Sequence, residues 1–348
     1  MNRTRLPERN LDVMRAIAVT CVVVDHVLWA RNRSLPFITD WQLGRAGVLL
    51  FFVHTSLVLM SSLERGGSSA HWVRKFYTRR AFRIYPLAIV AVLATVVFRI
   101  PSNVPDIFTQ PASRTIAANL LLVQNISNDR SIMGMLWTLP IEVQMYVMLP
   151  LLFLAARKSV YHVLVVLTAG VMFALAVQYA PVPGLWRLGV GIFVPCFIGG
   201  VLAFAILRLK TQFKLPAWTW IPFLAVVIAS FVLLGPTATR PEPGWLFCIA
   251  VGCAIPFVTE LSDSKITRVA KTMCTYSYGT YLLLVPALWI GFVELRTQAI
   301  PLQWLAFGAA LFALPWTAYT FIERPGIETG RRLTGGHKVA LASTIPVP

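Results

Sequence analysis

The sequence predicts an all-α integral membrane protein, a bundle of about ten transmembrane helices with both termini on the cytoplasmic side. Of the 348 residues, 57% are hydrophobic and only 13% are charged, and the mean hydropathy is +0.69, far above that of ordinary soluble domains. Apolar stretches of about 17–22 residues, enough to cross a hydrocarbon core roughly 30 Å thick, recur along the chain. They lie near 11–30, 46–63, 84–100, 137–156, 161–179, 189–208, 218–235, 245–261, 276–293 and 302–322.

The basic residues indicate how these helices are oriented. Roughly 20 of the 31 Lys and Arg residues fall in the two tails and in the loops near 64–80, 157–158, 208–214 and 262–271. By the positive-inside rule these segments are cytoplasmic. The net charge of +17 is then explained by orientation and contact with anionic lipid. We expect no nucleic-acid partner, because the basic residues do not gather on one folded face.

The chain divides into one membrane domain over 1–333 and a tail over 334–348 that we expect to be disordered. The polar N-terminus has no signal-peptide pattern, so the first span is expected to be retained. The segment Thr115–Gln124 is too short to cross and is expected to be re-entrant or interfacial. The cysteines show no metal-binding or redox spacing, so we expect no metal site.

The first apolar stretch carries a polar stripe. On a helix, Arg15 and His26 lie within roughly 20° of each other, and Asp12 lies about 40° away. Because ionisable groups are costly in lipid, this stripe predicts the wall of a cavity or a seam in the bundle. We expect His26 to be catalytic, and Asp12 and Arg15 to form an i, i+3 pair at the cytoplasmic entrance.

An arginine cluster opens the third apolar stretch, in the sequence RKFYTRRAFRIYP. Arg79, Arg80 and Arg83 share one helix face, and such a set of donors suits bidentate binding of phosphate. The alternative is an anchor that contacts lipid headgroups. Arg83 favours phosphate binding, because it lies inside the helix, just before Tyr85, where an anchor need not reach.

Two further ionisable residues fall inside apolar stretches. Glu142 lies about 8 Å below the outer surface, close to the depth of His26, which predicts a base and its orienting partner. The alternative is a structural contact between helices. For His54 we expect a structural histidine bonded to a neighbouring helix, with a second titrating group as the alternative. The HExxH, GxSxG and Walker patterns are absent, so common hydrolase and NTPase chemistries have no support.

Taken together, these segments resemble the acyltransferase 3 family of integral-membrane O-acyltransferases, which modify bacterial surface glycans and some secondary metabolites. Any one motif is weak, but six occur in the family's order with the correct spacing. They are RNLDVMRAIAVTCVVVDH (9–26), GRAGVLLFFVHTSLVL (44–59), FYTRRAFRIYP (76–86), LWTLPIEVQMYVMLP (136–150), YSYGTYLLLVP (276–286) and FIERPGIETGRRL (321–333).

The resemblance implies a bundle of ten transmembrane helices in the bacterial cytoplasmic membrane that moves an acyl group from cytoplasmic acyl-CoA to a hydroxyl. The family's first-span histidine matches His26, and its Arg-x-x-Arg pair matches Arg80 and Arg83. Its Trp-Ser-Leu-x-x-Glu segment matches Trp137 to Glu142. The acceptor so implied is a cell-surface glycan, a lipid-linked sugar or a secondary metabolite.

The sequence departs from the family pattern at two places. The second-span pattern Phe-Phe-Val-Leu-Ser-Gly-Phe loses its glycine here and has His54 in the leucine position. In the later Tyr-Leu-x-His-x-Pro pattern, Leu284 stands where histidine is common. A mechanism that requires this second histidine is therefore left in doubt, and compensation by His54 is an alternative to its structural role.

From these residues we hypothesise an O-acyltransferase with acyl-CoA, such as acetyl-CoA, as donor substrate and no permanently bound cofactor. Arg79, Arg80 and Arg83 are expected to hold the phosphates. His26, oriented by Asp25 or Glu142, is expected to act as general base on the acceptor hydroxyl or as a transient acyl carrier. We further assign substrate contacts to Trp137 and Tyr85.

Two alternatives belong to other classes of protein. In a secondary transporter, His26, Glu142 and His54 would relay protons or bind a solute, and the chain would consist of two repeated halves with broken spans. No such symmetry is visible in the sequence, although GVGIFVPCFIGG (189–200) is a candidate break. The other alternative is a non-catalytic envelope or signalling protein descended from the enzyme family.

Overall fold

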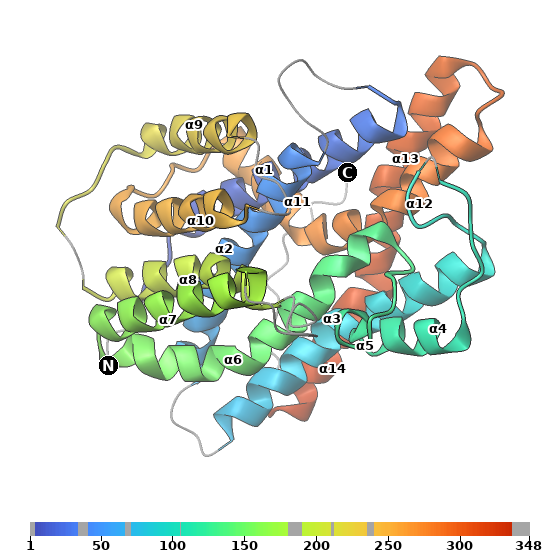
Figure 1. The fold of residues 1–348 in the computed structure, drawn as a ribbon. Helices are drawn as coiled ribbons and strands as arrows, with labels where there is room; N and C mark the ends of the chain where they lie inside the picture. The colour runs from blue at the N-terminus through green and yellow to red at the C-terminus, as the bar shows by residue number, and fades with distance from the viewer. Residues whose placement is uncertain are drawn as a thin grey trace.

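The computed structural model describes residues 4–33, 41–66, 71–104, 106–179, 190–209, 212–234 and 240–335 (Figure 1). Across these residues the chain is helical, apart from one isolated bridge between Leu215 and Val258. The longer helices are α1 (Glu8–Ala30), α2 (Gln42–Gly66), α3 (Trp72–Val97), α6 (Thr138–Lys158), α7 (Val160–Tyr179), α8 (Val190–Leu207), α9 (Trp220–Leu233), α10 (Glu242–Ala254), α11 (Lys265–Leu282), α13 (Ile300–Ala318) and α14 (Arg324–Leu333). The shorter segments are α4 (Ser113–Leu120), α5 (Gln124–Ser127), α12 (Leu284–Trp289), the 3-10 turns η1 (Gly134–Trp137), η3 (Ala217–Thr219) and η4 (Ile255–Phe257), and the π-helical turns η5 (Ile290–Glu294) and η6 (Tyr319–Glu323).

Among the described residues, six helices are long and apolar enough to cross a membrane, or seven if the pair formed by α11 and α12 counts as one span bent by 75°. Three apolar helical segments in the described residues are shorter, and they contain α8, α9 and α10. Each predicted apolar stretch overlaps a helix, but the predicted count of about ten spans and the side of the termini are not confirmed. The hydropathy pattern does not show where helices end. For example, α10 ends at Ala254 and the turn η4 begins at Ile255, within the apolar stretch predicted over 245–261.

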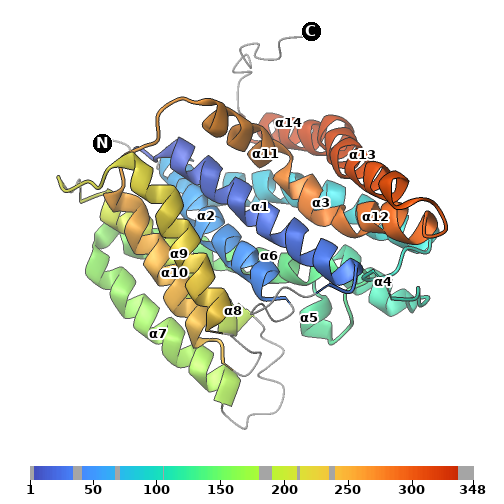
Figure 2. The same ribbon diagram turned by 90° about the horizontal axis from the view of Figure 1, so that it is seen from above.

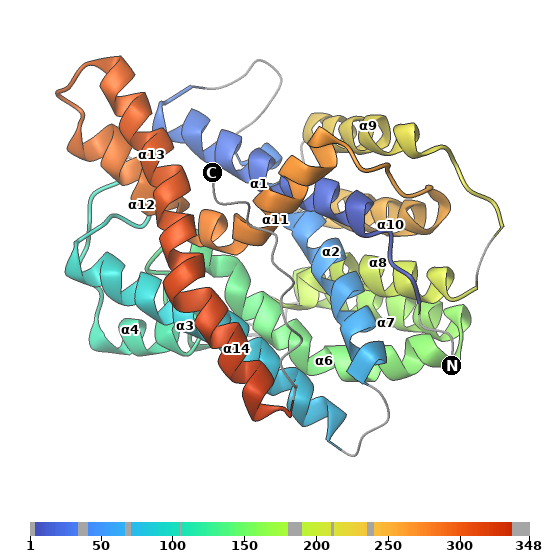
Figure 3. The same ribbon diagram turned by 180° about the vertical axis from the view of Figure 1, so that it is seen from behind.

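The helices pack around α1 and α2. α1 contacts α2 and α11, and α2 contacts α8, which in turn packs against α7 and α10. Seen from above, α7 to α10 lie on one side of α1 and α2, and α3, α13 and α14 lie on the other (Figure 2). Figure 3 shows α13 running on into α14, which packs against α3.

Close helix contacts depend on glycine. A Cβ atom on Gly47 would lie 2.4 Å from the Ala18 carbonyl oxygen, and one on Gly200 would lie 2.2 Å from the Val53 carbonyl oxygen. Glycine therefore lets α2 approach the backbones of both α1 and α8, as is common between membrane helices. The two contacts hold α2, which carries His54, close to both α1 and α8.

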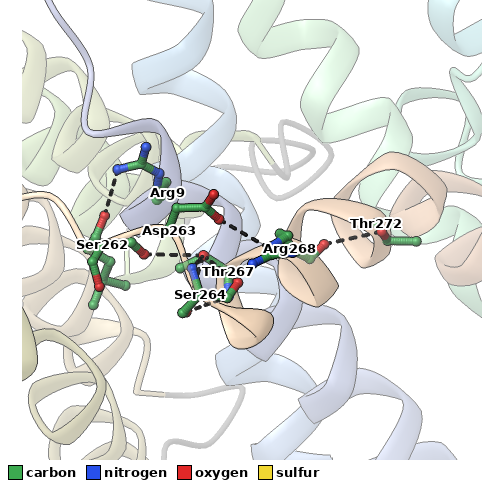
Figure 4. A network of polar contacts seen from close by, with 8 residues as sticks. Arg9, Ser262, Asp263, Ser264, Thr267, Arg268 and Thr272 are labelled. Atoms are coloured by element: carbon green, nitrogen blue, oxygen red, sulfur yellow. Dashed lines mark hydrogen bonds and ion pairs between the residues drawn. The ribbon is translucent and has the colours of Figure 1, made fainter. Parts of the chain in front are cut away.

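The start of α11 is fixed by a polar network (Figure 4). Ser264 and Thr267 form a capping box, with each side chain bonded to the other's backbone amide at 3.3 and 2.9 Å. Arg268 pairs with Asp263 at 3.3 Å, and Arg9 of α1 donates to the carbonyl of Leu261. These bonds tie the N-terminal ends of α1 and α11 together.

The short segment before α6 is held by buried polar bonds. Asn119 at the end of α4 donates to the Thr115 and Arg130 carbonyls and accepts from the Ile132 amide. Asp129 accepts from Thr115 at 2.9 Å, and hydrogen bonding from Ser127 is the main cause that holds its pKa below the usual range. The segment predicted to be re-entrant or interfacial thus forms α4 and a tight turn that lead to η1.

Candidate active site

Three cavities lie between the helices around α1 and α2, and each shares lining residues with the next. The first, here the basic cavity, has a volume of about 160 Å³ and lies between the end of α2 and the start of α3. Its charged lining residues are Arg65, Lys75, Arg79 and Arg80, and no described acidic residue lines it. Arg79 Nε donates to Thr334 Oγ1 at 2.8 Å, so the end of α14 closes one side. This end of the molecule can attract a phosphorylated ligand.

The second, here the inner cavity, shares Arg80 with the basic cavity and has a volume of about 110 Å³. Its wall is polar for a site among membrane helices. Arg15, His54, Glu142 and Tyr281 line it, with Arg83, Thr138, Tyr146 and Ser277 also contributing. The helices α1, α2, α3, α6 and α11 all supply these side chains.

The third, here the His26 chamber, has a volume of about 500 Å³ and shares Val48 and Tyr281 with the inner cavity. Thr4 bonds to Glu64 at the end of α2, so the N-terminal end of α1 lies near the basic cavity, whereas His26 lies close to the C-terminal end of α1. The inner cavity therefore lies between the other two in a row, and α1 lines the inner cavity with Arg15 and the His26 chamber with Asp25 and His26.

His26 is 5% exposed, and its Nδ1 lies 2.9 Å from the Val22 carbonyl oxygen one turn earlier. Because a carbonyl oxygen can only accept, Nδ1 carries the hydrogen and Nε2 keeps its lone pair in the neutral ring. Asp25 Oδ2 is 3.8 Å from Nδ1, and the Trp41 ring packs edge-on at 5.4 Å. The hydrogen bond that orients the imidazole is thus made by the backbone of α1.

Glu142 lines the inner cavity and accepts a hydrogen bond from Tyr146 one turn later. His26 belongs to the adjoining chamber, and no hydrogen bond joins the two residues in the described part of the chain. Glu142 and His26 were predicted to lie at the same depth in the membrane. Equal depth does not determine the direction in which each side chain points, so it does not bring the two into contact. Tyr281, which lines both cavities and shares a hydrogen bond of 3.0 Å with Thr138, lies between them.

The three arginines of the predicted phosphate cluster have different surroundings. Arg79 faces the basic cavity, and Arg80 lines both the basic and the inner cavity. Arg83 pairs with Glu323 Oε2 at 2.8 Å, and the Glu323 side chain is fully buried. The π-helical turn η6 carries Glu323, and Gly279 leaves it room, since a Cβ there would lie 3.1 Å from Glu323 Oε1.

Arg15 and His54 differ from what their sequence positions predict. Arg15 donates to Ser277 Oγ at 2.7 Å, while Asp12 lines a separate cavity, so the expected pair of Asp12 and Arg15 is not an ion pair among the described residues. His54 is 4% exposed, and its Nδ1 has no hydrogen-bond partner in the described structure, although a bond to a neighbouring helix was expected. Both side chains face the inner cavity instead.

Of the two residues expected to contact substrate, Trp137 lines one of the three cavities and Tyr85 lines none of them. Trp137 lines the His26 chamber and packs against Phe193 at 5.7 Å. Tyr85 donates to the Leu121 carbonyl at 3.2 Å and is not among the residues that line the three cavities.

Leu284, in the place of the family's histidine, is fully buried. No group of three or more His, Cys, Asp or Glu residues in the described ranges is arranged to hold a metal ion.

Several site residues are not identified by the sequence reasoning. Tyr281 and Glu323 fall within recognised motifs, but nothing in the motifs shows that Tyr281 separates two cavities or that Glu323 pairs with Arg83. The sequence identifies Lys75 and Arg65 only as charges of the loop near 64–80 and gives Trp41 no role. The chain bends by 75° after Leu282, next to Tyr281, and the hydropathy of this stretch does not predict that bend.

In the described part of the chain, helices long and apolar enough to span a membrane surround a row of cavities lined by arginine, glutamate and histidine side chains, and such groups among membrane helices indicate a functional site. A family profile described as an acyltransferase domain matches residues 8–320, so the chain belongs to the acyltransferase 3 family. The protein is a multi-pass membrane O-acyltransferase. No curated protein and no solved structure matches the chain.

Proposed function

We propose that this enzyme transfers an acyl group from cytoplasmic acyl-CoA to a hydroxyl of a cell-surface glycan, or of a related lipid-linked or secondary-metabolite acceptor, in the bacterial cytoplasmic membrane. The observation that carries the proposal is the row of cavities from the basic cavity past Arg80 and Tyr281 to His26. The basic side chains at one end can bind phosphates, and the His26 imidazole at the other end can act as a general base.

The donor is proposed to bind with its phosphates in the basic cavity and its thioester arm in the inner cavity. Arg79 and Arg80, which the sequence singles out, and Lys75 beside them supply the charges. Arg83 has a different role in this proposal, because it is already paired with Glu323. Arg15 and His26 are about 16 Å apart along α1 at about 1.5 Å per residue, a distance within reach of the extended arm of CoA.

In the proposed reaction, His26 is the general base. Its Nε2 takes the proton of the acceptor hydroxyl while the hydroxyl oxygen attacks the thioester carbonyl carbon. When the tetrahedral adduct collapses, the carbon–sulfur bond breaks and the thiolate of CoA takes the proton back from the imidazolium. The bond from Nδ1 to the Val22 carbonyl supports this role, since it holds the ring and keeps Nε2 available.

The acceptor is proposed to enter the His26 chamber. Its volume of about 500 Å³ is larger than that of the other two cavities in the row, and its wall includes the indole rings of Trp41 and Trp137. Aromatic rings offer apolar faces together with a polar N–H, which suits a sugar or an amphipathic metabolite.

The test is acyl-group analysis of envelope glycans and extracted metabolites from cells in which the gene is deleted, restored, or restored as His26→Ala. We expect one ester to disappear on deletion, to return with the native chain and to stay below about 1% of the native amount with the variant, the loss expected for a missing general base. His162→Ala is the matched control, because His162 lies at the start of α7, bonded to Ser159. An ester profile that is unchanged by deletion, with expression verified, would contradict the proposal.

A further inference from the structure

The inner cavity contains a histidine whose hydrogen bonding is incomplete. His54 lies in the middle of α2, and its imidazole is enclosed by the helices around the cavity. Other polar groups of this wall have partners within the protein. Arg15 bonds to Ser277, Glu142 to Tyr146, and Thr138 to Tyr281. His54 Nδ1 has no partner in the described structure, and neither has the Nε atom of Arg80.

A buried polar nitrogen without a partner costs free energy, so its presence calls for an explanation. The unpartnered nitrogen is explained if a ligand completes the hydrogen bonding of His54 when it occupies the cavity. A neutral imidazole can donate from one nitrogen and accept at the other, which matches an amide group.

The ligand proposed to occupy this cavity has such groups. Between its phosphates and its thioester, CoA carries two amides, and the inner cavity lies between the basic cavity and the His26 chamber. We propose that His54 is a positioning residue that hydrogen-bonds an amide of the pantetheine arm and so holds the thioester toward His26. This inference rests on the proposed function, because it requires a donor that carries a pantetheine arm, as acyl-CoA does.

The experiment compares the binding of two ligands to the full chain in detergent or lipid nanodiscs. CoA has the arm, whereas adenosine 3′,5′-bisphosphate has the nucleotide and phosphates without it. For His54→Leu we expect the Kd for CoA to rise about three- to tenfold, the range for one neutral hydrogen bond, and the Kd for the bisphosphate to stay the same. His54→Gln, which keeps a donor and an acceptor, is expected to recover at least half of that change in affinity.

Two controls separate positioning from folding. Ser56 lies on the same helix, and its hydroxyl donates to the Phe52 and Val53 carbonyls. For Ser56→Ala we expect the Kd values for CoA and for the bisphosphate to equal those of the native chain. The thermal midpoint of each variant shows whether it is folded. A His54→Leu protein that binds CoA as tightly as the native chain, or that loses affinity for both ligands equally, would overturn the role of His54 alone. A native chain that binds neither ligand would overturn the proposed donor, and this inference with it.

Discussion

Helices α8 and α9 contain no Asp, Glu, Lys, Arg or His, whereas α1 carries Asp12, Arg15, Asp25 and His26 along its length. α8 and α9 belong to the apolar scaffold, which is the side of the molecule formed by α7 to α10, and α1 belongs to the polar seam, which is formed by the helices that line the inner cavity and the His26 chamber. In the scaffold, His162 and Glu242 lie among the first residues of α7 and α10. Because ionisable groups are expensive among membrane helices, their absence from the middle of the scaffold helices separates the chemistry from the scaffold.

Buried polar contacts distinguish the seam from the scaffold. In the scaffold, backbones meet at glycines, as where a Cβ on Gly252 of α10 would lie 2.1 Å from the Gly199 carbonyl oxygen of α8. In the seam, α1 and α2 also meet at a glycine, Gly47, but buried polar contacts are added, such as the ion pair of Arg83 and Glu323. We therefore expect substitutions in the scaffold to change stability alone, and substitutions in the seam to change stability, donor binding or both.

The largest effect on stability is expected in the seam. Arg83→Leu leaves the Glu323 carboxylate buried without its partner, and loss of one member of a buried ion pair costs about 3 kcal/mol or more. The thermal midpoint in detergent is the measurement. Arg83→Leu combined with Glu323→Leu is the control, and we expect it to be more stable than the single variant. If both proteins lose stability equally, the ion pair is not what holds η6 against α3.

A smaller loss is expected in the scaffold. Gly252→Ala forces α10 away from α8, at a cost of about 1–3 kcal/mol, and is expected to leave the Kd for CoA of the folded protein unchanged. Gly308→Ala is the matched control, because nothing lies within 4 Å of a Cβ at that position of α13 and alanine is the better helix former. A weaker affinity for CoA in Gly252→Ala would show that scaffold and seam are not independent.

The smallest effect, on the Kd for the donor, is expected at the basic cavity. Lys75→Gln removes one charge from the basic cavity while the others remain, so the Kd for both CoA and adenosine 3′,5′-bisphosphate should rise about threefold at low salt. The difference between the native and variant proteins should shrink as ionic strength increases. Arg74→Gln is the control, since Arg74 is exposed and does not line the cavity. An equal loss of affinity in both variants would indicate a general effect of charge.

The sequence was sufficient for the helical membrane class, the family and most of the charged and histidine residues that line the cavities, because hydropathy and motif order are properties of the chain itself. It failed where the outcome depends on how helices turn against one another. His26 and Glu142 lie at one predicted depth yet line different cavities, and Arg83 meets a carboxylate far away in the sequence. His54 was expected to be bonded to a neighbouring helix, and only the packed structure shows that its Nδ1 is not.

In the proposed reaction the donor enters at the basic cavity and its acyl group is delivered at His26. The most direct measurement supplies radiolabelled acetyl-CoA to sealed membrane vesicles of known orientation, with His26→Ala vesicles as background. Orientation is read from the labelling of an Arg74→Cys variant by an impermeant maleimide, because Arg74 is exposed beside the basic cavity. We predict that label reaches the acceptor only in vesicles that expose Arg74 to the added donor. Labelling only in vesicles of the opposite orientation would contradict the account.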